Sequence, residues 1–209
     1  MNIAIIDYGM GNLKSVKKAL IALDFKAEIT ADPKDILKAD KVILPGVGAF
    51  RDAIQTLNET SLSEAIREVV KKGTPLLGIC LGMQLMFDKS YEYGEYEGLG
   101  LLPGEIIHFK PENMLQEHGE RLKVPHMGWN NLEIVKAAPL FKGIEDGSSV
   151  YFVHSYYLET SEDIVSGYTT YGSHIAVAAQ KDNIFATQFH PEKSGTIGLQ
   201  ILKNFGGMR

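Results

Sequence analysis

The chain has a single cysteine, Cys80, among its 209 residues. One cysteine cannot form an internal disulfide, and it cannot supply the several thiolates of a cysteine-based structural zinc site. The lack of disulfides suits a reducing compartment, so we expect a cytoplasmic protein without a bound metal. Whether this cysteine is a buried filler or a nucleophile is the first question that the sequence raises.

Long apolar runs and an excess of positive charge are also missing. No apolar stretch approaches the ~20 residues that a membrane-spanning helix needs. The first residues, MNIAIIDYG, lack a basic leader and a cleavage region, so we expect no signal peptide. The net charge of −5 argues against general affinity for nucleic acid or an anionic membrane. The hydrophobic share of 44% is typical of a globular chain that buries a core.

The first half of the chain alternates short apolar runs with amphipathic segments. This alternation predicts a parallel sheet with both faces covered by helices. Strands are expected over residues 2–7, 26–30, 41–46 and 75–79, and helices over 12–23, 33–37, 50–57 and 61–73, with a further helix beginning at Met83.

The second half changes to runs and turns that favour antiparallel strands. Strands are expected within 98–109, 130–135, 148–159 and 164–172, and a hairpin within 175–190 that turns at Lys181-Asp182-Asn183. A helix over 196–207 follows. We therefore predict an α/β fold in one domain, residues 1–209, with a central, mostly parallel sheet flanked by helices and antiparallel strands in its second half.

Cys80 lies between the end of a predicted strand and the start of a predicted helix. Ligands of open α/β sheets bind at the carboxyl ends of strands, so this is a position where a site is expected. The pattern Gly78-Ile79-Cys80-Leu81-Gly82 has the spacing of the nucleophile elbow Gly-x-Ser-x-Gly, a sharp turn that exposes its central residue. In such a turn the backbone N–H of Leu81 points at an oxyanion formed on the substrate.

A thiol nucleophile needs a base, and six histidines are present. His118 lies in a charged loop, and His108 and His174 have no acid nearby to orient them. His126 and His154 also lack a carboxylate close by in sequence. His190 differs, because Pro191 constrains the turn after it and Glu192 can fold back onto the imidazole. We therefore predict a Cys80–His190–Glu192 arrangement.

A second oxyanion donor is expected from another loop at a strand end. The segment Pro45-Gly46-Val47-Gly48 follows a predicted strand, and its glycines let backbone N–H groups approach a ligand. It does not fit the dinucleotide pattern, because Arg51 stands where the third glycine belongs. The sequence therefore indicates no nucleotide cofactor.

Together, the Pro45–Gly48 loop, the Gly78–Gln84 elbow and His190-Pro191-Glu192 resemble the class I glutamine amidotransferases, in the family's order and over nearly the whole chain. The resemblance implies that the Cys80 thiolate attacks the side-chain amide of glutamine, with no cofactor. His190 then protonates the departing ammonia, and Glu192 orients His190. The N–H of Leu81 and one from Gly46, Val47 or Gly48 would stabilise the oxyanion.

The resemblance also implies a glutamine-binding set. Gln84 lies one helical turn beyond Cys80, and the backbone of Ser155 and Tyr156 would grip the substrate carboxylate. An acid holds the substrate amino group. Spacing favours Glu92, although Glu95 and Glu97 are close enough to remain open.

Four stretches, IDYGMGNLKS, LPGVGAF, VPHMGWN and YFVHSYY, favour one subgroup of the family. In that subgroup the glutaminase is a separate subunit. It forms a heterodimer with a (β/α)₈-barrel cyclase that makes imidazole glycerol phosphate and AICAR in histidine biosynthesis. Candidate interface residues are His126, Trp129, Tyr151 and Lys193, within or near Pro125–Asn130. The Gly46–Gly48 loop is our candidate switch, in which a backbone flip completes the oxyanion hole.

Other functions remain open at this stage. The same elbow could serve a thiol hydrolase of the dienelactone type, although Gln84 and the order of His190 and Glu192 argue against it. A sister glutaminase could feed pyridoxal phosphate, purine or anthranilate synthesis. A pseudo-glutaminase that only binds a partner is the non-enzymatic alternative.

Overall fold

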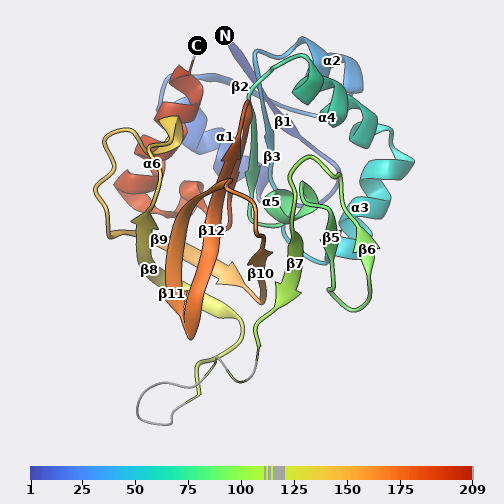
Figure 1. The fold of residues 1–209 in the computed structure, drawn as a ribbon. Coiled ribbons are helices and arrows are strands. Elements are labelled where there is room, and N and C mark those ends of the chain that lie inside the picture. Colours follow the sequence, from blue (N-terminus) through green and yellow to red (C-terminus); the bar gives the residue numbers. More distant parts are fainter. Residues whose placement is uncertain (111, 113, 115–120, 209) are drawn as a thin grey trace.

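The computed structural model describes residues 1–110, 112, 114 and 121–208 (Figure 1). Its first half contains β1 (Asn2–Ile6), α1 (Leu13–Ala22), β2 (Lys26–Thr30), α2 (Pro33–Lys38), β3 (Lys41–Leu44), α3 (Phe50–Glu59), α4 (Leu62–Lys71) and β4 (Leu76–Ile79). Together with β13 (Ile184–Thr187), the strands lie in the parallel order β2-β1-β3-β4-β13. Strands β3 and β4 are buried along their whole length, which explains why their sequences, apart from Lys41 at the start of β3, are apolar runs.

The sheet continues with antiparallel strands from the second half of the chain. Strand β12 (Ser173–Lys181) forms the expected hairpin with β13, in which Lys181 pairs with Ile184. Beyond β12 lie β10 (Tyr156–Glu159), β7 (Glu105–His108), β5 (Lys89–Ser90) and β6 (Tyr96–Glu97). Strand β11 (Val165–Tyr171) pairs with β12 and with β8 (His126–Ile134), which pairs with β9 (Ser148–His154). The predicted mixed α/β sheet is confirmed.

The core lies on both faces of this sheet, because side chains alternate along each strand. Ile3 and Ile5 of β1 belong to one apolar cluster, and Ala4 and Ile6 belong to the other. Helices α1 and α6 (Gly195–Gly207) cover the first face, whereas α2, α3 and α4 cover the second (Figure 1).

Three details differ from the sequence expectations. The helix after Cys80, α5 (Leu81–Leu85), begins two residues before Met83, because the chain reverses at Cys80 itself. Strand β8 begins at His126, earlier than expected. The hairpin of β5 and β6 was not predicted, since two-residue strands carry no periodic pattern. No helix in the described part of the chain is long and apolar enough to cross a bilayer.

Candidate active site

The sharp turn predicted between a strand and a helix at Cys80 is present in the structure. Cys80 follows β4 directly and has φ 56° and ψ −112°, a backbone conformation that residues other than glycine rarely adopt. A Cβ at Gly82 would lie 1.8 Å from the Leu44 carbonyl oxygen, and one at Gly78 would lie 2.9 Å from the Gly82 carbonyl oxygen. Both flanking positions therefore need glycine, because any Cβ there would clash with its surroundings.

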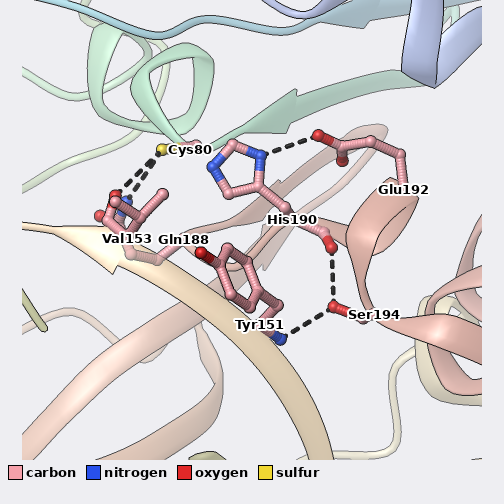
Figure 2. A network of polar contacts seen from close by, with 7 residues as sticks. All are labelled: Cys80, Tyr151, Val153, Gln188, His190, Glu192 and Ser194. Atoms are coloured by element: carbon pink, nitrogen blue, oxygen red, sulfur yellow. Dashed lines mark hydrogen bonds and ion pairs between the residues drawn. The ribbon is translucent and has the colours of Figure 1, made fainter. Parts of the chain in front are cut away.

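His190 and Glu192 form a buried pair beside Cys80 (Figure 2). His190 Nδ1 donates to Glu192 Oε1 at 2.8 Å, and each side chain is only 2% exposed. Because the carboxylate fixes the proton on Nδ1, Nε2 is the nitrogen that can take a proton. Nε2 has no hydrogen-bond partner among the described residues, and Figure 2 shows the imidazole between the sulfur and the carboxylate.

The electrostatics of His190 favour a charged imidazole. Burial lowers the pKa of His190, but the Cys80 and Glu192 side chains more than offset this effect and raise it to about 10. A thiolate beside an imidazolium is the charge state that a cysteine nucleophile uses. The buried pair thus provides both an acid for a leaving group and an orienting carboxylate.

Two contacts around Cys80 were not foreseen from the sequence. Cys80 Sγ lies 3.9 Å from the Val153 carbonyl oxygen, and Gln188 Nε2 donates toward the sulfur at 3.8 Å (Figure 2). The Gln188 side-chain oxygen also accepts from Gln84 Nε2 at 3.0 Å. Gln188 stands two residues before His190 and therefore shares its face of the chain, a signal that the sequence contained.

Ser194 was also missed, because a serine in a turn carries no distinctive pattern. Its hydroxyl donates to the His190 carbonyl at 2.7 Å and accepts from the Tyr151 backbone N–H at 3.0 Å (Figure 2). Ser194 is 1% exposed. It therefore ties the histidine turn to β9 and fixes where the imidazole sits.

A cavity of about 280 Å³ opens beside Cys80, near the lower end of the roughly 300–1,000 Å³ common for ligand sites. Its lining contains these residues predicted for glutamine binding or catalysis: Val47, Gly48, Cys80, Leu81, Gln84, Glu92, Ser155 and Tyr156. Pro125, Val153 and His154 complete it. Side chains from distant parts of the sequence thus meet at the carboxyl edge of β3, β4 and β13.

The position of Glu92 separates it from the other two acids. Glu92 lines the cavity, and its Oε2 accepts from the Phe50 N–H, at the start of α3, at 2.6 Å. Glu95 is exposed and pairs with Lys89 at 2.6 Å, and Glu97 is exposed as well. The structure therefore favours Glu92 as the acid that reaches a bound ligand.

The Gly46–Gly48 loop, the predicted oxyanion loop, is closed in this structure. The Leu81 N–H donates to the Gly46 carbonyl oxygen at 3.3 Å. This N–H is therefore not available to a substrate oxyanion while the loop keeps this conformation. Gly48 has φ +105°, a value that glycine adopts at little cost. Of these three loop residues, Val47 and Gly48 line the cavity and Gly46 does not.

His154 and His126 form a buried hydrogen-bonded chain. His154 Nδ1 donates to the Tyr156 carbonyl at 2.8 Å, so His154 Nε2 accepts from His126 Nδ1 at 2.9 Å. Asn130 then donates to His126 Nε2 at 3.3 Å. Burial lowers the pKa of His126 to about 4 and that of His154 to about 3, so both rings are neutral, as this chain requires.

The interface candidates separate into two groups. Trp129 is 58% exposed, its ring lies 6.1 Å from that of Tyr151, and Lys193 Nζ lies 5.9 Å from the Tyr151 ring. His126 is 3% exposed and is not part of this surface, which corrects our expectation for its side chain. The reason is strand alternation, since Met127 and Trp129 face outward from β8 while His126 faces inward.

The other histidines in the described part of the chain, His108 and His174, do not line this cavity. His174 Nε2 lies 2.9 Å from Glu133 Oε2, so the expectation that it lacks an acid is wrong, because strand β8 brings this acid from far along the chain. His118 lies outside the described residues. Within residues 1–110, 112, 114 and 121–208, no three His, Cys, Asp or Glu side chains group as metal ligands.

Comparison with known proteins agrees with this geometry. The family model described as glutamine amidotransferase class-I matches residues 4–207, and the chain belongs to this family. Within it, the chain is 54% identical to imidazole glycerol phosphate synthase subunit HisH of Geobacter sulfurreducens, over 99% of both chains. It is 53% identical to the subunit of the same name from Moorella thermoacetica, over 98% of this chain and 93% of that one.

A solved structure supports the fold independently. PurLQS from Thermotoga maritima superposes with a TM-score of 0.72 at 18% identity, covering 98% of this chain and 96% of that one. At that identity the likeness concerns the fold alone.

Proposed function

We propose that this chain is the glutaminase subunit of an imidazole glycerol phosphate synthase, acting in the cytoplasm as one domain over residues 1–209. It hydrolyses glutamine to glutamate and ammonia, and the ammonia passes to a cyclase subunit that forms imidazole glycerol phosphate and AICAR in histidine biosynthesis. One observation carries the proposal: the strained Cys80 faces a cavity, with the His190–Glu192 pair buried beside it. Relatives at 54% identity bear the name of that synthase.

The first half of the reaction forms a thioester. The Cys80 thiolate attacks the side-chain amide carbon of glutamine, and the carbonyl oxygen becomes an oxyanion. His190 gives its proton to the amide nitrogen, the C–N bond breaks, and ammonia leaves. Glu192 Oε1, 2.8 Å from His190 Nδ1, holds the imidazole in the required tautomer and stabilises its charge.

The second half releases glutamate. His190, now neutral, takes a proton from water, and the resulting hydroxide attacks the thioester carbon. The C–S bond breaks, which returns the thiolate and the imidazolium. The Glu92 carboxylate would hold the substrate amino group, Gln84 would face the substrate side chain, and the backbone of Ser155 and Tyr156 would hold the carboxylate. All four residues line the cavity.

The closed oxyanion loop supports the proposal that activity is switched. Rotation of the Gly46–Val47 peptide would move the Gly46 carbonyl away from the Leu81 N–H and turn the Val47 N–H toward the oxyanion. The Leu81 N–H and the Val47 N–H could then both donate to the oxyanion, whereas in the closed state the Leu81 N–H is occupied. Each such donor raises kcat by about 10²–10³-fold. The partner's nucleotide ligand would favour the rotated state, so the isolated chain would hydrolyse glutamine slowly.

The partner surface is the group formed by exposed Trp129, half-buried Tyr151 and exposed Lys193. Pro125 lines the cavity and immediately precedes β8, which carries Trp129, so this surface lies close to the place where ammonia forms. A (β/α)₈-barrel cyclase seated here as a heterodimer would receive ammonia directly. Tryptophan is enriched among residues that dominate binding energy.

A glutaminase assay tests the proposal. Glutamate release is measured for the chain alone, with the cyclase subunit, and with the cyclase and its nucleotide ligand. The proposal predicts slow release in the first case and strong stimulation in the last. Lactone cleavage without glutamate release would favour the dienelactone-type hydrolase. Capture of another synthase in a pull-down would favour a sister glutaminase.

A further inference from the structure

Tyr8 is a buried phenol at the oxyanion loop to which the mechanism above gives no role. It follows β1, is 4% exposed, and belongs to the apolar cluster on the α2–α4 face of the sheet. Its hydroxyl donates to the Pro45 carbonyl at 2.9 Å. A buried hydroxyl is costly unless it is paired, so this contact fixes both groups.

The loop residue next to Pro45 is clamped against the same phenol. A Cβ at Gly46 would lie 2.3 Å from the Tyr8 hydroxyl oxygen, 3.0 Å from Leu81 Cβ and 3.1 Å from the Gly82 nitrogen. The Pro45–Gly46 segment is therefore held between Tyr8 and the first residues of α5. The next peptide, Gly46–Val47, is held through its carbonyl by the Leu81 N–H at 3.3 Å.

We propose that Tyr8 is a positioning residue of the oxyanion loop, whose hydroxyl fixes the Pro45 carbonyl so that the Gly46–Val47 peptide turns against an immobile neighbour. Tyr8 bonds to the peptide that precedes the rotating one, so its hydrogen bond persists in both states of the loop. It defines where the Val47 N–H points after the rotation. This inference rests on the proposed glutaminase function.

The chemistry of Tyr8 fits a permanent donor. Burial, together with the nearby Cys80, raises the pKa of Tyr8 well above its ordinary value, so the hydroxyl keeps its proton. The residue therefore acts on the reaction through the loop and takes no part in proton transfer.

The test is Tyr8→Phe, which removes one oxygen and keeps the ring in the core. The complex with the cyclase subunit is assayed with glutamine and, separately, with ammonia. We expect kcat with glutamine to fall about 3- to 10-fold, with KM for glutamine unchanged, because the Val47 N–H is then held less well toward the oxyanion; this is less than the roughly 10²–10³ lost with a whole oxyanion donor. Ammonia-dependent turnover should stay at the wild-type level.

Thr160→Val is the matched control, because it removes a hydroxyl that donates to another proline carbonyl, Pro103 O, at 3.0 Å and away from the cavity. Both activities of this variant should match the wild type. The inference is overturned if Tyr8→Phe keeps the wild-type kcat, raises only KM, or loses ammonia-dependent turnover equally. If the wild-type complex itself releases no glutamate, the proposed glutaminase function is wrong, and the role inferred for Tyr8 is wrong as well.

Discussion

At the residue scale, the site depends on the restricted backbone conformation of Cys80 and its neighbours. Cys80 carries positive φ between two glycines that have no room for a Cβ. Such strain persists only where the surroundings enforce it, and here the Cys80 N–H donates to the Thr187 carbonyl at 2.8 Å. Cys80 is thereby held at the wall of the cavity, although the residue also packs against the apolar core.

Removal of the triad carboxylate should change the pH dependence of hydrolysis. In Glu192→Gln the His190 pKa loses a contribution that raises it, so the imidazolium deprotonates at lower pH. We expect the alkaline limb of the kcat profile to shift toward lower pH, and kcat to fall on the order of 10²–10⁴-fold. Glu95→Gln, at an exposed ion pair, is the control and should keep the wild-type profile. An unmoved limb would contradict the role of Glu192.

At the element scale, the sequence predicted the parallel half of the sheet because apolar runs and helical periods are strong local signals. It also located the elbow, the loop and the histidine turn, since each follows a strand. The short β5–β6 hairpin and Ser194 escaped prediction, because their roles arise from tertiary contacts that leave no local pattern. Gln188 was overlooked, although its position two residues before His190 was a local signal. Strand alternation in β8 explains why His126 faces inward, but the start of that strand was predicted too late to show it.

The hydrogen bond between the buried histidines His126 of β8 and His154 of β9 should make the free energy of unfolding depend on pH. Below pH ~6.5, His126 and His154 are protonated in the unfolded chain but stay neutral in the folded one, because burial lowers their pKa values to about 4 and about 3. The free energy of unfolding therefore falls as the pH drops from about 6.5 toward about 4. His126→Phe keeps the ring stacking with Tyr171 but leaves His154 without its donor. We expect this variant to be less stable than wild type at pH 7, by about 1–3 kcal/mol.

The same variant should lose less stability than wild type between pH 7 and pH 5, because one of the two acid-sensitive groups is gone. Urea midpoints at both pH values measure this directly. An equal loss in wild type and His126→Phe would show that the histidine chain does not set the acid sensitivity.

At the scale of the whole molecule, the site and the exposed aromatic surface share strands β8 and β9. Trp129 is too exposed to serve the core, and its surroundings fit a binding surface. Trp129→Ala should weaken association with the cyclase subunit about 30-fold or more, without a change in fold. Val135→Ala, on the same face beyond the end of β8, is the control, since it also truncates an exposed apolar residue. Titration calorimetry that finds equal affinities for both variants would place the interface elsewhere.

The proposed function depends on Cys80 forming the thioester through which glutamine supplies ammonia. The most direct measurement compares Cys80→Ala with the wild-type chain, each bound to the cyclase subunit, for product formation from glutamine and from free ammonia. We expect the variant to make no product from glutamine but to keep wild-type turnover with ammonia. Undiminished turnover with glutamine would contradict it, because the reaction would then proceed without the thiol.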